Sequence, residues 1–451
     1  MCVTALDGSA FCLHIHGMQN SRVVSLLGAL ALGACSVGND DGVQMQGGQT
    51  GDEFDEITQR VMGDAPRVSA DGLSAQAASD ELAQFAWSFY QEIAPADENF
   101  VYSPYSIATA AAMLYAGAAG TTHSEMADVF AFSEENDAFH QSRNDLQHVL
   151  AMRNIAGTEQ RNAQVLKISN DFWMAPRLDP TETFLNVLSA YYGAPVFLFE
   201  GNPEDVRRAI NGKVSDDTMS LIPELLPPQS ITVDTVFVLT NALYFKANWL
   251  WEFDKEKTAP ADFTGADGST MQVDMMHLAA DQGLRHASVD GTDVLVMPYF
   301  GNELGFVALA PATDKFSEFR SSLDRAQLQS LLSQTQAAAV NLGFPKMEVE
   351  FTLPLKEELL EAGMTSAFVS GEADFSRLAN NDIWITDAFH QTKVILDEEG
   401  TEAAAATAFV GVDESAGPEP IVVTIDRAFV FLIRDVETEA ILFLGQYVGP
   451  S

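Results

Sequence analysis

The sequence predicts an α+β fold, with helices in the first half of the folded chain and strands in the second. Two helix-like blocks come early, at residues 79–94 and 103–118, whereas strand-like runs dominate after residue 235. No glycine-rich phosphate loop joins a strand to a helix, which argues against a doubly wound parallel sheet. The 451 residues, 47% of them hydrophobic, suffice for one large domain or for two or three.

The chain is strongly acidic. It has 24 Lys and Arg against 64 Asp and Glu, so its formal net charge is −40. Such a surface repels phosphate backbones and anionic lipid, so nucleic acid is not an expected partner. The sequence shows no basic face of the kind that binds a polyanion, so a polyanion cofactor is not expected. A well-solvated acidic surface explains most single carboxylates, and an excess this large also suits a saline environment.

The first 35 residues have the layout of a secretory signal peptide. Arg22 precedes an apolar run at 23–32, and small residues lead to Cys35 in "LGAC". The run is too short to span a membrane as a mature helix. The motif resembles a bacterial lipobox, in which Cys35 becomes the lipidated first residue; the alternative is an ordinary signal cleaved at a small residue. Met18 is the better start of translation.

Residues 36–74 are rich in Gly, Asp and Gln, which predicts a flexible tether before one folded domain at 75–451. The expected location is therefore secreted or cell-envelope, as an outer-membrane lipoprotein that faces the periplasm or the outside. Membrane contact is expected only through a lipid on Cys35. Because no cysteine follows Cys35, the domain has no disulfide framework and no Cys-based metal site or nucleophile.

Each element of the domain has its own signal. Apolar residues repeat at helical spacing from Leu82 to Phe89, with Ser79 as the expected N-cap. The block at 103–118 is apolar nearly all round, which is typical of a buried helix. Strand-like runs follow, and two neighbouring strands joined by a turn end the chain. The runs are 235–245, 293–300, 304–310, 347–353, 392–399, 421–435 and 440–449.

Catalytic motifs are absent from the sequence. It has no G-x-S-x-G elbow, no H-E-x-x-H, no Walker loop and no C-x-x-C. Six histidines beyond the N-terminal segment are scattered without the spacing of metal ligands. His390, at the entrance to a strand, is interpreted as a buried structural histidine rather than a general base. No enzymatic activity, cofactor or metal is therefore expected.

The stretch "LDEEGTEAAAATAFVGVDESAGPEPIVV" at 396–423 places a run of small residues between two strands. By propensity alone "TEAAAATAF" is a surface helix, because alanine is the best helix former and Thr401 could cap it. The blocks around it favour a different interpretation.

Five blocks together resemble the serpin family of serine protease inhibitors, and they occur in the family's order over residues 75–450. They read "NFVYSPYSIATAAAMLYAGAAGTTHSEM" (99–126), "VLTNALYFKANWLWEFDKEKTAPADF" (238–263), "FPKMEVEFTLPLKEELLEAGMTSAF" (344–368), "FHQTKVILDEEGTEAAAATAF" (389–409) and "TIDRAFVFLIRDVETEAILFLGQYVGP" (424–450). The resemblance implies three β-sheets, eight or nine helices and an exposed reactive-centre loop at about 398–420.

The resemblance also implies a function: a monomeric, irreversible suicide inhibitor of serine proteases. Its cleaved loop would insert as a strand into the main sheet and hold the protease as a covalent acyl complex. In a strand, alternate residues face opposite sides, so the odd-numbered small residues from Thr401 to Thr407 share one face and Glu402 lies on the wetter one. Gly400 would allow a sharp backbone reversal. The implied hinge is Glu398, Glu399, Gly400, Thr401, Glu402, Ala403, Ala404, Ala405, Ala406 and Thr407.

Matching motifs imply two further sites beside the hinge. One is the breach, where insertion begins and where Lys346 and Glu398 form an ion pair. Its residues are Trp249, Lys346 and Glu398. The other is the polar shutter cluster beneath the sheet. Its residues are Ser103, Ser106, Asn241 and His390. Two positions depart from the family pattern: Ala428 stands where proline is usual, and Lys213 where an aromatic residue is common.

The resemblance implies a scissile bond at Glu414–Ser415, because in inhibitory members this bond usually lies fourteen residues on from the position of Gly400. Counting backwards from the following strand gives Gly417–Pro418 instead, which proteases rarely cut. A glutamate at the scissile position suggests a Glu-preferring serine protease.

Other targets stay open. The bond Val412–Asp413, or cleavage after Phe409, would suit an elastase- or subtilisin-like enzyme, and cleavage after Asp413 an Asp-specific cysteine protease. The alternative function is a non-inhibitory serpin that acts as a binding or chaperone-like protein. Non-inhibitors tend to carry bulky, charged or proline residues at the hinge, where this chain has small ones.

Overall fold

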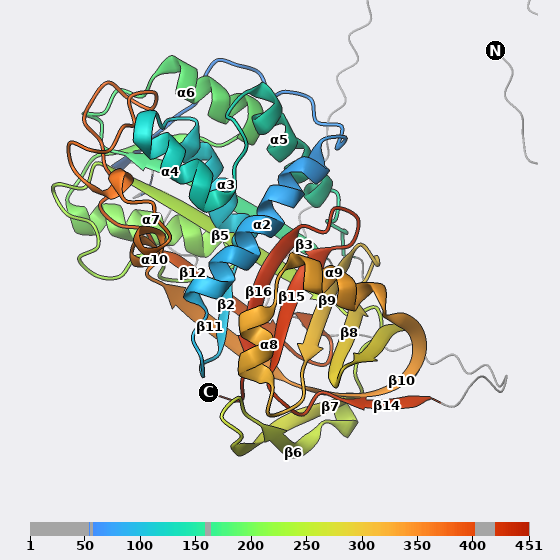
Figure 1. Cartoon of the computed structure of the whole chain (residues 1–451). Coiled ribbons are helices and arrows are strands. Elements are labelled where there is room, and N and C mark those ends of the chain that lie inside the picture. Colours follow the sequence, from blue (N-terminus) through green and yellow to red (C-terminus); the bar gives the residue numbers. More distant parts are fainter. Residues whose placement is uncertain (1–53, 55–56, 158–163, 402–419, 451) are drawn as a thin grey trace, which may run out of the picture. The chain divides into compact units, whose positions relative to one another are not determined.

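The computed structural model describes residue 54 and residues 57–157, 164–401 and 420–450 (Figure 1). The expected α+β class is confirmed, with nine α-helices within these residues. No helix in this part of the chain is long and apolar enough to cross a membrane. The signal segment with Cys35, and most of the tether, lie outside the described residues.

Six of the described α-helices precede the long strand of the main sheet and three follow it. They are α2 (Ala75–Ile93), α3 (Pro104–Tyr115), α4 (Gly120–Phe130), α5 (Asp137–Ala151), α6 (Glu182–Val187), α7 (Pro203–Asp217), α8 (Phe316–Ser322), α9 (Arg325–Ser333) and α10 (Leu355–Glu361). A π-helical turn, Leu188–Tyr192, extends α6. Short 3-10 turns lie at Lys255–Lys257 and Ser366–Phe368.

The two predicted helices form, but one begins earlier than expected. α2 starts at Ala75, so Ser79 lies inside the helix, where its buried hydroxyl donates to the Thr438 carbonyl (2.6 Å). The prediction of Ser79 as N-cap is therefore wrong. In α3 every residue is buried, and the Ser103 side chain accepts the Ser106 N–H as an N-cap.

A seven-stranded sheet carries the hinge. Among its described strands, β3 and β4 are the only parallel neighbours. β13 is antiparallel to both β5 and β12, so these two strands run parallel to each other. In spatial order its strands are β1 (Thr58–Val61), β4 (Val196–Phe199), β3 (Val165–Met174), β5 (Phe237–Asn248), β13 (Gly400–Thr401), β12 (His390–Leu396) and β11 (Met347–Leu353).

The other strands form one continuous nine-stranded sheet with β6 attached to β7. One part of β7 pairs with β6 and another with β8, so this assembly divides at β7 into two sheets and gives the expected three in all. In spatial order its strands are β14 (Ile421–Thr424), β10 (Gln336–Pro345), β7 (Thr270–Val289), β8 (Thr292–Pro298), β9 (Leu304–Ala310), β15 (Phe429–Asp435), β16 (Ile441–Tyr447) and β2 (Phe100–Tyr102), with β6 (Ala259–Thr264) beside β7.

The run 421–435, predicted as one strand, is two strands in different places. β14 pairs with β10 in parallel, whereas β15 pairs antiparallel with β9 and β16. The chain leaves the sheet between them, where the Ile425 N–H donates to Gly343 and the Ala428 N–H to Thr264. Periodicity alone does not reveal this break, because both strands are apolar.

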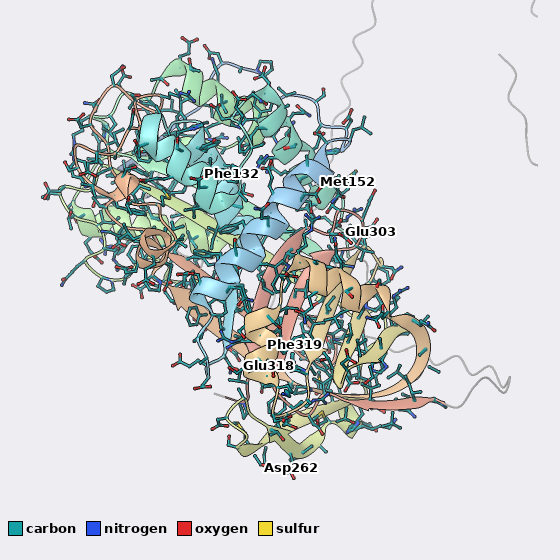
Figure 2. The ribbon with its side chains drawn as sticks, in the orientation of Figure 1. Phe132, Met152, Asp262, Glu303, Glu318 and Phe319 are labelled. Atoms are coloured by element: carbon teal, nitrogen blue, oxygen red, sulfur yellow. The ribbon has the colours of Figure 1, made fainter. Side chains whose placement is uncertain are left out.

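Two hydrophobic cores lie on opposite faces of the seven-stranded sheet. The larger contains α2, α3 and the second sheet, while the smaller lies beneath α7, which packs against β3 and β5 (Figure 1). On α8 the exposed Glu318 is next to the buried Phe319 (Figure 2).

Residues 57–74 differ from the expected tether because they pack on the domain. β1 pairs antiparallel with β4 at the edge of the main sheet. The Gly63 N–H donates to Ser189 Oγ and the Val68 N–H to the Ala190 carbonyl, each at 2.8 Å. The folded domain therefore begins before Ala75.

Candidate functional site: a hinge between two strands

Two hinge residues already form a strand within the main sheet. Gly400 and Thr401 pair with Asn248 and Ala247 of β5, and Thr401 also pairs with Leu396 of β12. Thr401 is only 3% exposed. Its hydroxyl lies 2.6 Å from the buried hydroxyl of Tyr299. The side chain of Thr401 therefore points into the larger core.

Gly400 ends the chain reversal between the antiparallel strands β12 and β13, and close packing also requires glycine there. Its backbone is nearly extended, with φ +159°. A Cβ at this position would lie 2.1 Å from the Ala247 carbonyl oxygen and 2.7 Å from the Asn248 Cα. These are backbone atoms, which cannot turn aside as a side chain does. Only glycine lets β13 come this close to β5.

Trp249 holds the segment before β13 in place. Its indole ring stacks on Tyr299 with centroids 4.6 Å apart and an interplanar angle of 9°. The indole N–H donates to the Asp397 carbonyl (3.0 Å), and the backbone N–H donates to Glu399 (2.8 Å). One aromatic residue at the end of β5 thus contacts both the hinge and the core beneath it.

Lys346 and Glu398 form the predicted ion pair. Lys346 Nζ lies 3.0 Å from Glu398 Oε2, and the Thr258 hydroxyl donates to Oε1 at 2.8 Å. Burial alone would raise the pKa of Glu398, but a backbone N–H, Lys346 and Thr258 outweigh it and hold the pKa below its usual value. The carboxylate is therefore ionised and held by both partners at neutral pH.

A second charged pair involves Glu399, which is 3% exposed and contacts the exposed amine of Lys255. Its carboxylate raises the pKa of Lys255 by hydrogen bonding. Burial, followed by the charge of Glu399, raises the pKa of the nearby Glu252 carboxyl. Asp397 closes a turn by accepting the N–H groups of Glu399 (2.9 Å) and Gly400 (3.2 Å).

Three of the four predicted shutter residues can be placed, and two of them are directly bonded. The Ser103 N–H donates to His390 Nε2 (3.0 Å), and the Ser103 hydroxyl donates to the Leu442 carbonyl (2.7 Å). Because a backbone N–H can only donate, Nε2 is an acceptor and the neutral ring carries its proton on Nδ1. Burial lowers the pKa of His390 to about 3. The interpretation of a buried, neutral histidine therefore agrees with the geometry.

The other two shutter residues are Ser106 and Asn241. The Ser106 hydroxyl is buried and makes no hydrogen bond within the described part of the chain. Asn241 lies in β5, where it pairs with Asn170, but the described residues do not include its side chain. The hinge residues from Glu402 to Thr407 and every predicted scissile bond also lie outside the described residues.

Four residues that the sequence analysis missed complete the hinge site. They come from distant parts of the chain and meet through strand pairing, so no local pattern reveals most of them. Asp397 is the exception, because an Asp three residues before a Gly is a turn signal. The four residues are Lys255, Thr258, Tyr299 and Asp397.

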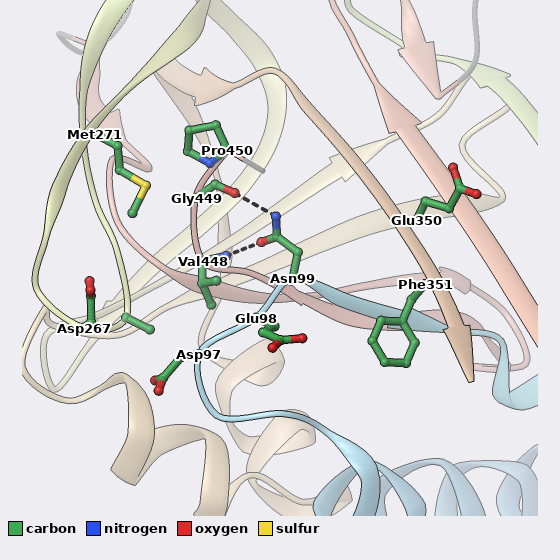
Figure 3. A pocket seen from close by; sticks show the side chains of 11 residues that line it. Asp97, Glu98, Asn99, Asp267, Met271, Glu350, Phe351, Val448, Gly449 and Pro450 are labelled. Carbon is green, nitrogen blue, oxygen red and sulfur yellow. Dashed lines mark hydrogen bonds between the residues drawn. The ribbon is translucent and has the colours of Figure 1, made fainter. Parts of the chain in front are cut away.

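An acidic hollow of about 440 Å³ lies elsewhere on the domain (Figure 3). Carboxylates of Asp97, Glu98, Asp267 and Glu350 line it, and Asn99 joins the chain beside it to Gly449 and Val448. The lining residues include no cationic side chain, so the hollow is unsuited to an anion. Within the described residues, no cluster of three His, Cys, Asp or Glu side chains could hold a metal ion.

A family model described as Serpin (serine protease inhibitor) matches residues 80–450. The chain is a serpin. The serpin is 32% identical over 373 residues to an uncharacterised serpin-like protein of Thermococcus kodakarensis, covering 81% of this chain and 84% of the relative. It is 30% identical over 378 residues to human antithrombin-III, covering 81% and 80%. Serpins are generally protease inhibitors rather than catalysts.

Solved serpin structures match the fold. The native state of the thermophilic serpin tengpin gives a TM-score of 0.75 at 25% identity, covering 87% of this chain and all of that one. Human thyroxine-binding globulin complexed with its hormone gives a TM-score of 0.72 at 28% identity, covering 84% and 100%.

Both departures of this serpin from the family pattern have a structural counterpart. The Ala428 N–H donates to the Thr264 carbonyl at 3.0 Å, a bond that proline could not make. Lys213 on α7 pairs with Asp171 (3.0 Å) and Asp217 (2.6 Å) and lies 5.8 Å from the Phe197 ring. A cation bound on three sides thus occupies the usual aromatic position.

Proposed function

We propose that this serpin is an irreversible suicide-substrate inhibitor of serine proteases. The observation that carries the proposal is β13, a two-residue strand between two parallel strands. Its small, buried Thr401 and its Gly400, which close packing requires, begin a strand that the rest of the loop would extend between β5 and β12. Further small residues, from Ala403 to Thr407, come next in the sequence. The insertion of small side chains between packed strands displaces the fewest neighbours.

β5 is long enough to pair with the inserted loop over most of its length. Thr401 faces Ala247, and each further loop residue would face one residue earlier on β5, so Gly411 would reach Phe237 at the start of the strand. A bond at Glu414–Ser415 would then pass the far end of β5. Thirteen steps at about 3.3 Å carry it roughly 43 Å from the hinge. A shorter insertion, ending at Phe409, would leave part of β5 unpaired.

Insertion of the loop would trap the acyl-enzyme intermediate of the protease. The protease serine oxygen attacks the Glu414 carbonyl carbon, the bond to the Ser415 nitrogen breaks, and that nitrogen leaves as an amine with the proton from the protease base. The loop is then free at its new C-terminus. Insertion before water attacks the ester would hold the protease in covalent linkage.

The test is incubation of the full chain with Glu-specific, elastase-like and subtilisin-like serine proteases and with an Asp-specific cysteine protease. We expect an SDS-stable complex with a serine protease, and mass spectrometry of the released C-terminal fragment identifies the bond. In Thr401→Arg, a charged side chain would have to enter the core beside Tyr299. We expect that variant to be cleaved without complex. A covalent complex at parental yield with Thr401→Arg would contradict the proposal.

A matched variant separates the hinge effect from a general charge effect. Ser321→Arg adds the same charge at an exposed residue of α8, away from the main sheet, and should inhibit as the parent does. If no protease in the panel forms a complex and the intact chain simply remains uncleaved or is degraded, the non-inhibitory alternative replaces the proposal.

A further inference from the structure

An apolar cavity of about 70 Å³ lies beside the N-terminal ends of β5 and β12. Phe237 and Leu239 line it from β5, and Ala388 lines it just before β12, while α3, α4 and α10 enclose it. Among its sixteen lining residues only Asp387 and His390 are polar. The cavity therefore suits an apolar group.

We propose that Phe409 of the inserted loop occupies this cavity and stabilises the new strand in its fully inserted position. The proposal rests on the proposed function, because it needs the loop to enter between β5 and β12.

The register of β13 directs Phe409 to the cavity. Thr401 faces Ala247 on β5 and Leu396 on β12, antiparallel to both. Each further loop residue would face one residue earlier on both strands. Eight residues on, the inserted Phe409 would lie between Leu239 and Ala388, and both of these line the cavity.

The alternation of side chains also places Phe409 on the correct face. Thr401 points into the larger core, where it contacts Tyr299. Residues an even number of positions along a strand share a face, so Phe409 points the same way. Leu239 and Ala388 pack against that same core. Val410 would face the other side, where Val238 packs against the core beneath α7.

The sizes of the loop residues match this destination. The inward positions before Phe409 hold only Thr or Ala, and Thr407 would lie across from the polar His390. A large residue among them would obstruct each step of entry, whereas one at the end is buried only after the strands have parted. A cavity of about 150 Å³ accommodates benzene. An added strand about 4.8 Å wide between β5 and β12 would enlarge the present cavity toward that volume.

The test uses a synthetic peptide, EAAAATAFVGV (residues 402–412), with the intact full-length serpin, whose own Thr401 already lies between β5 and β12. We expect the parent peptide to bind and to raise the thermal midpoint. The peptide with Phe409→Ala should bind at least about tenfold more weakly, because it leaves the enlarged cavity unfilled. The matched peptide with Val410→Ala should lose no more than about threefold. Affinities come from fluorescence anisotropy of labelled peptides.

A cavity-filling variant of the protein provides an independent arm. In Ala388→Phe the parent peptide should bind several-fold more weakly, whereas the Phe409→Ala peptide should bind as well as to the parent protein or better. Equal binding of the parent and Phe409→Ala peptides to the unaltered serpin would contradict the role of Phe409 but not strand insertion. Failure of every peptide to bind or stabilise the serpin contradicts strand insertion itself. The peptide comparison does not depend on whether Ala388→Phe folds.

Discussion

The two ends of the β5–β12 boundary differ in chemistry and in occupancy. At the breach end, β13 already lies between the strands, and charged side chains surround it, with Lys346 bound to Glu398 and Lys255 to Glu399. At the far end, β12 begins with the neutral His390, and an apolar cavity lies beside the same two strands. Charged pairs thus surround the point where the loop enters, whereas the far end is apolar apart from His390 and Asp387.

The desolvation of charge explains this difference. At the breach the lysine partners remain partly exposed, so the hinge carboxylates keep water and counter-charge nearby. Beneath the sheet His390, Ser103 and Ser106 are buried, and an ion there would cost several kcal/mol unless it were paired. A neutral imidazole and small hydroxyls can exchange hydrogen bonds as strands part without that cost.

The largest expected loss of stability comes from a substitution that prevents β13 from packing against β5. Gly400→Ala places a methyl group against the Ala247 carbonyl oxygen, so we expect about 3 kcal/mol less stability, the upper range for overpacking. The hinge should leave the sheet, and hydrogen exchange at residues 400 and 401 should accelerate. The control is Gly305→Ala in β9, where the nearest atom to the new Cβ would be 3.8 Å away. Equal losses in the two variants would show that β13 is not closely packed.

The far end should respond to acid in a window that the breach does not share. The pKa of His390 is about 3 when folded, below the ordinary value of about 6.5. Between these values the unfolded chain binds the extra proton, so stability contributed by the neutral ring is lost as pH falls from 6.5 toward 3. We expect His390 to account for about 2 kcal/mol lost between pH 7 and pH 5.

His390→Asn should remove this part of the pH dependence, as measured by denaturant unfolding across that interval. His148→Asn, at an exposed position on α5, is the matched control and should leave the slope unchanged. A parental slope in His390→Asn would mean that the far end is not held neutral by this histidine.

The same contrast separates what the sequence predicts from what it does not. The ion pair of Lys346 and Glu398 was predicted from short motifs that match the family pattern, and it forms; Trp249, from a third such motif, contacts the same segment. Tyr299 and Thr258 could not be found, because they meet the hinge only through the pairing of strands more than a hundred residues apart. The chain reversal at Gly400 was predicted, but its close approach to the backbone of β5 was not, because that contact depends on a strand distant in the sequence.

Composition misled the prediction at the N-terminal edge of the domain. Residues 57–74 are polar and rich in small side chains, which is typical of a tether. They are ordered by backbone hydrogen bonds to Ser189 and Ala190, and the donors of such bonds carry no sequence signal. The cavity beside β5 and β12 is likewise invisible in the sequence, because it depends on five separate elements.

The smallest effect tests whether the charges of the breach belong to the hinge or merely to the surface. Lys346→Met removes the partner of Glu398 but leaves Thr258, so we expect about 1 kcal/mol less stability at pH 7. The matched variant is Lys393→Met in β12, whose partners Glu348 and Glu350 are about half exposed, and it should cost less than about 0.5 kcal/mol.

The acid dependence of Lys346→Met identifies the responsible carboxylate. Because the pKa of Glu398 is held below its usual value, its contribution is complete above the unfolded value of about 4.5 and is lost as pH falls through the folded one. The difference between parent and Lys346→Met should therefore persist at pH 5, where the contribution of His390 is already falling, and disappear only at lower pH. A difference that fades together with the His390 contribution would mean that both ends of the β5–β12 boundary titrate as one unit, and the contrast between them would fail.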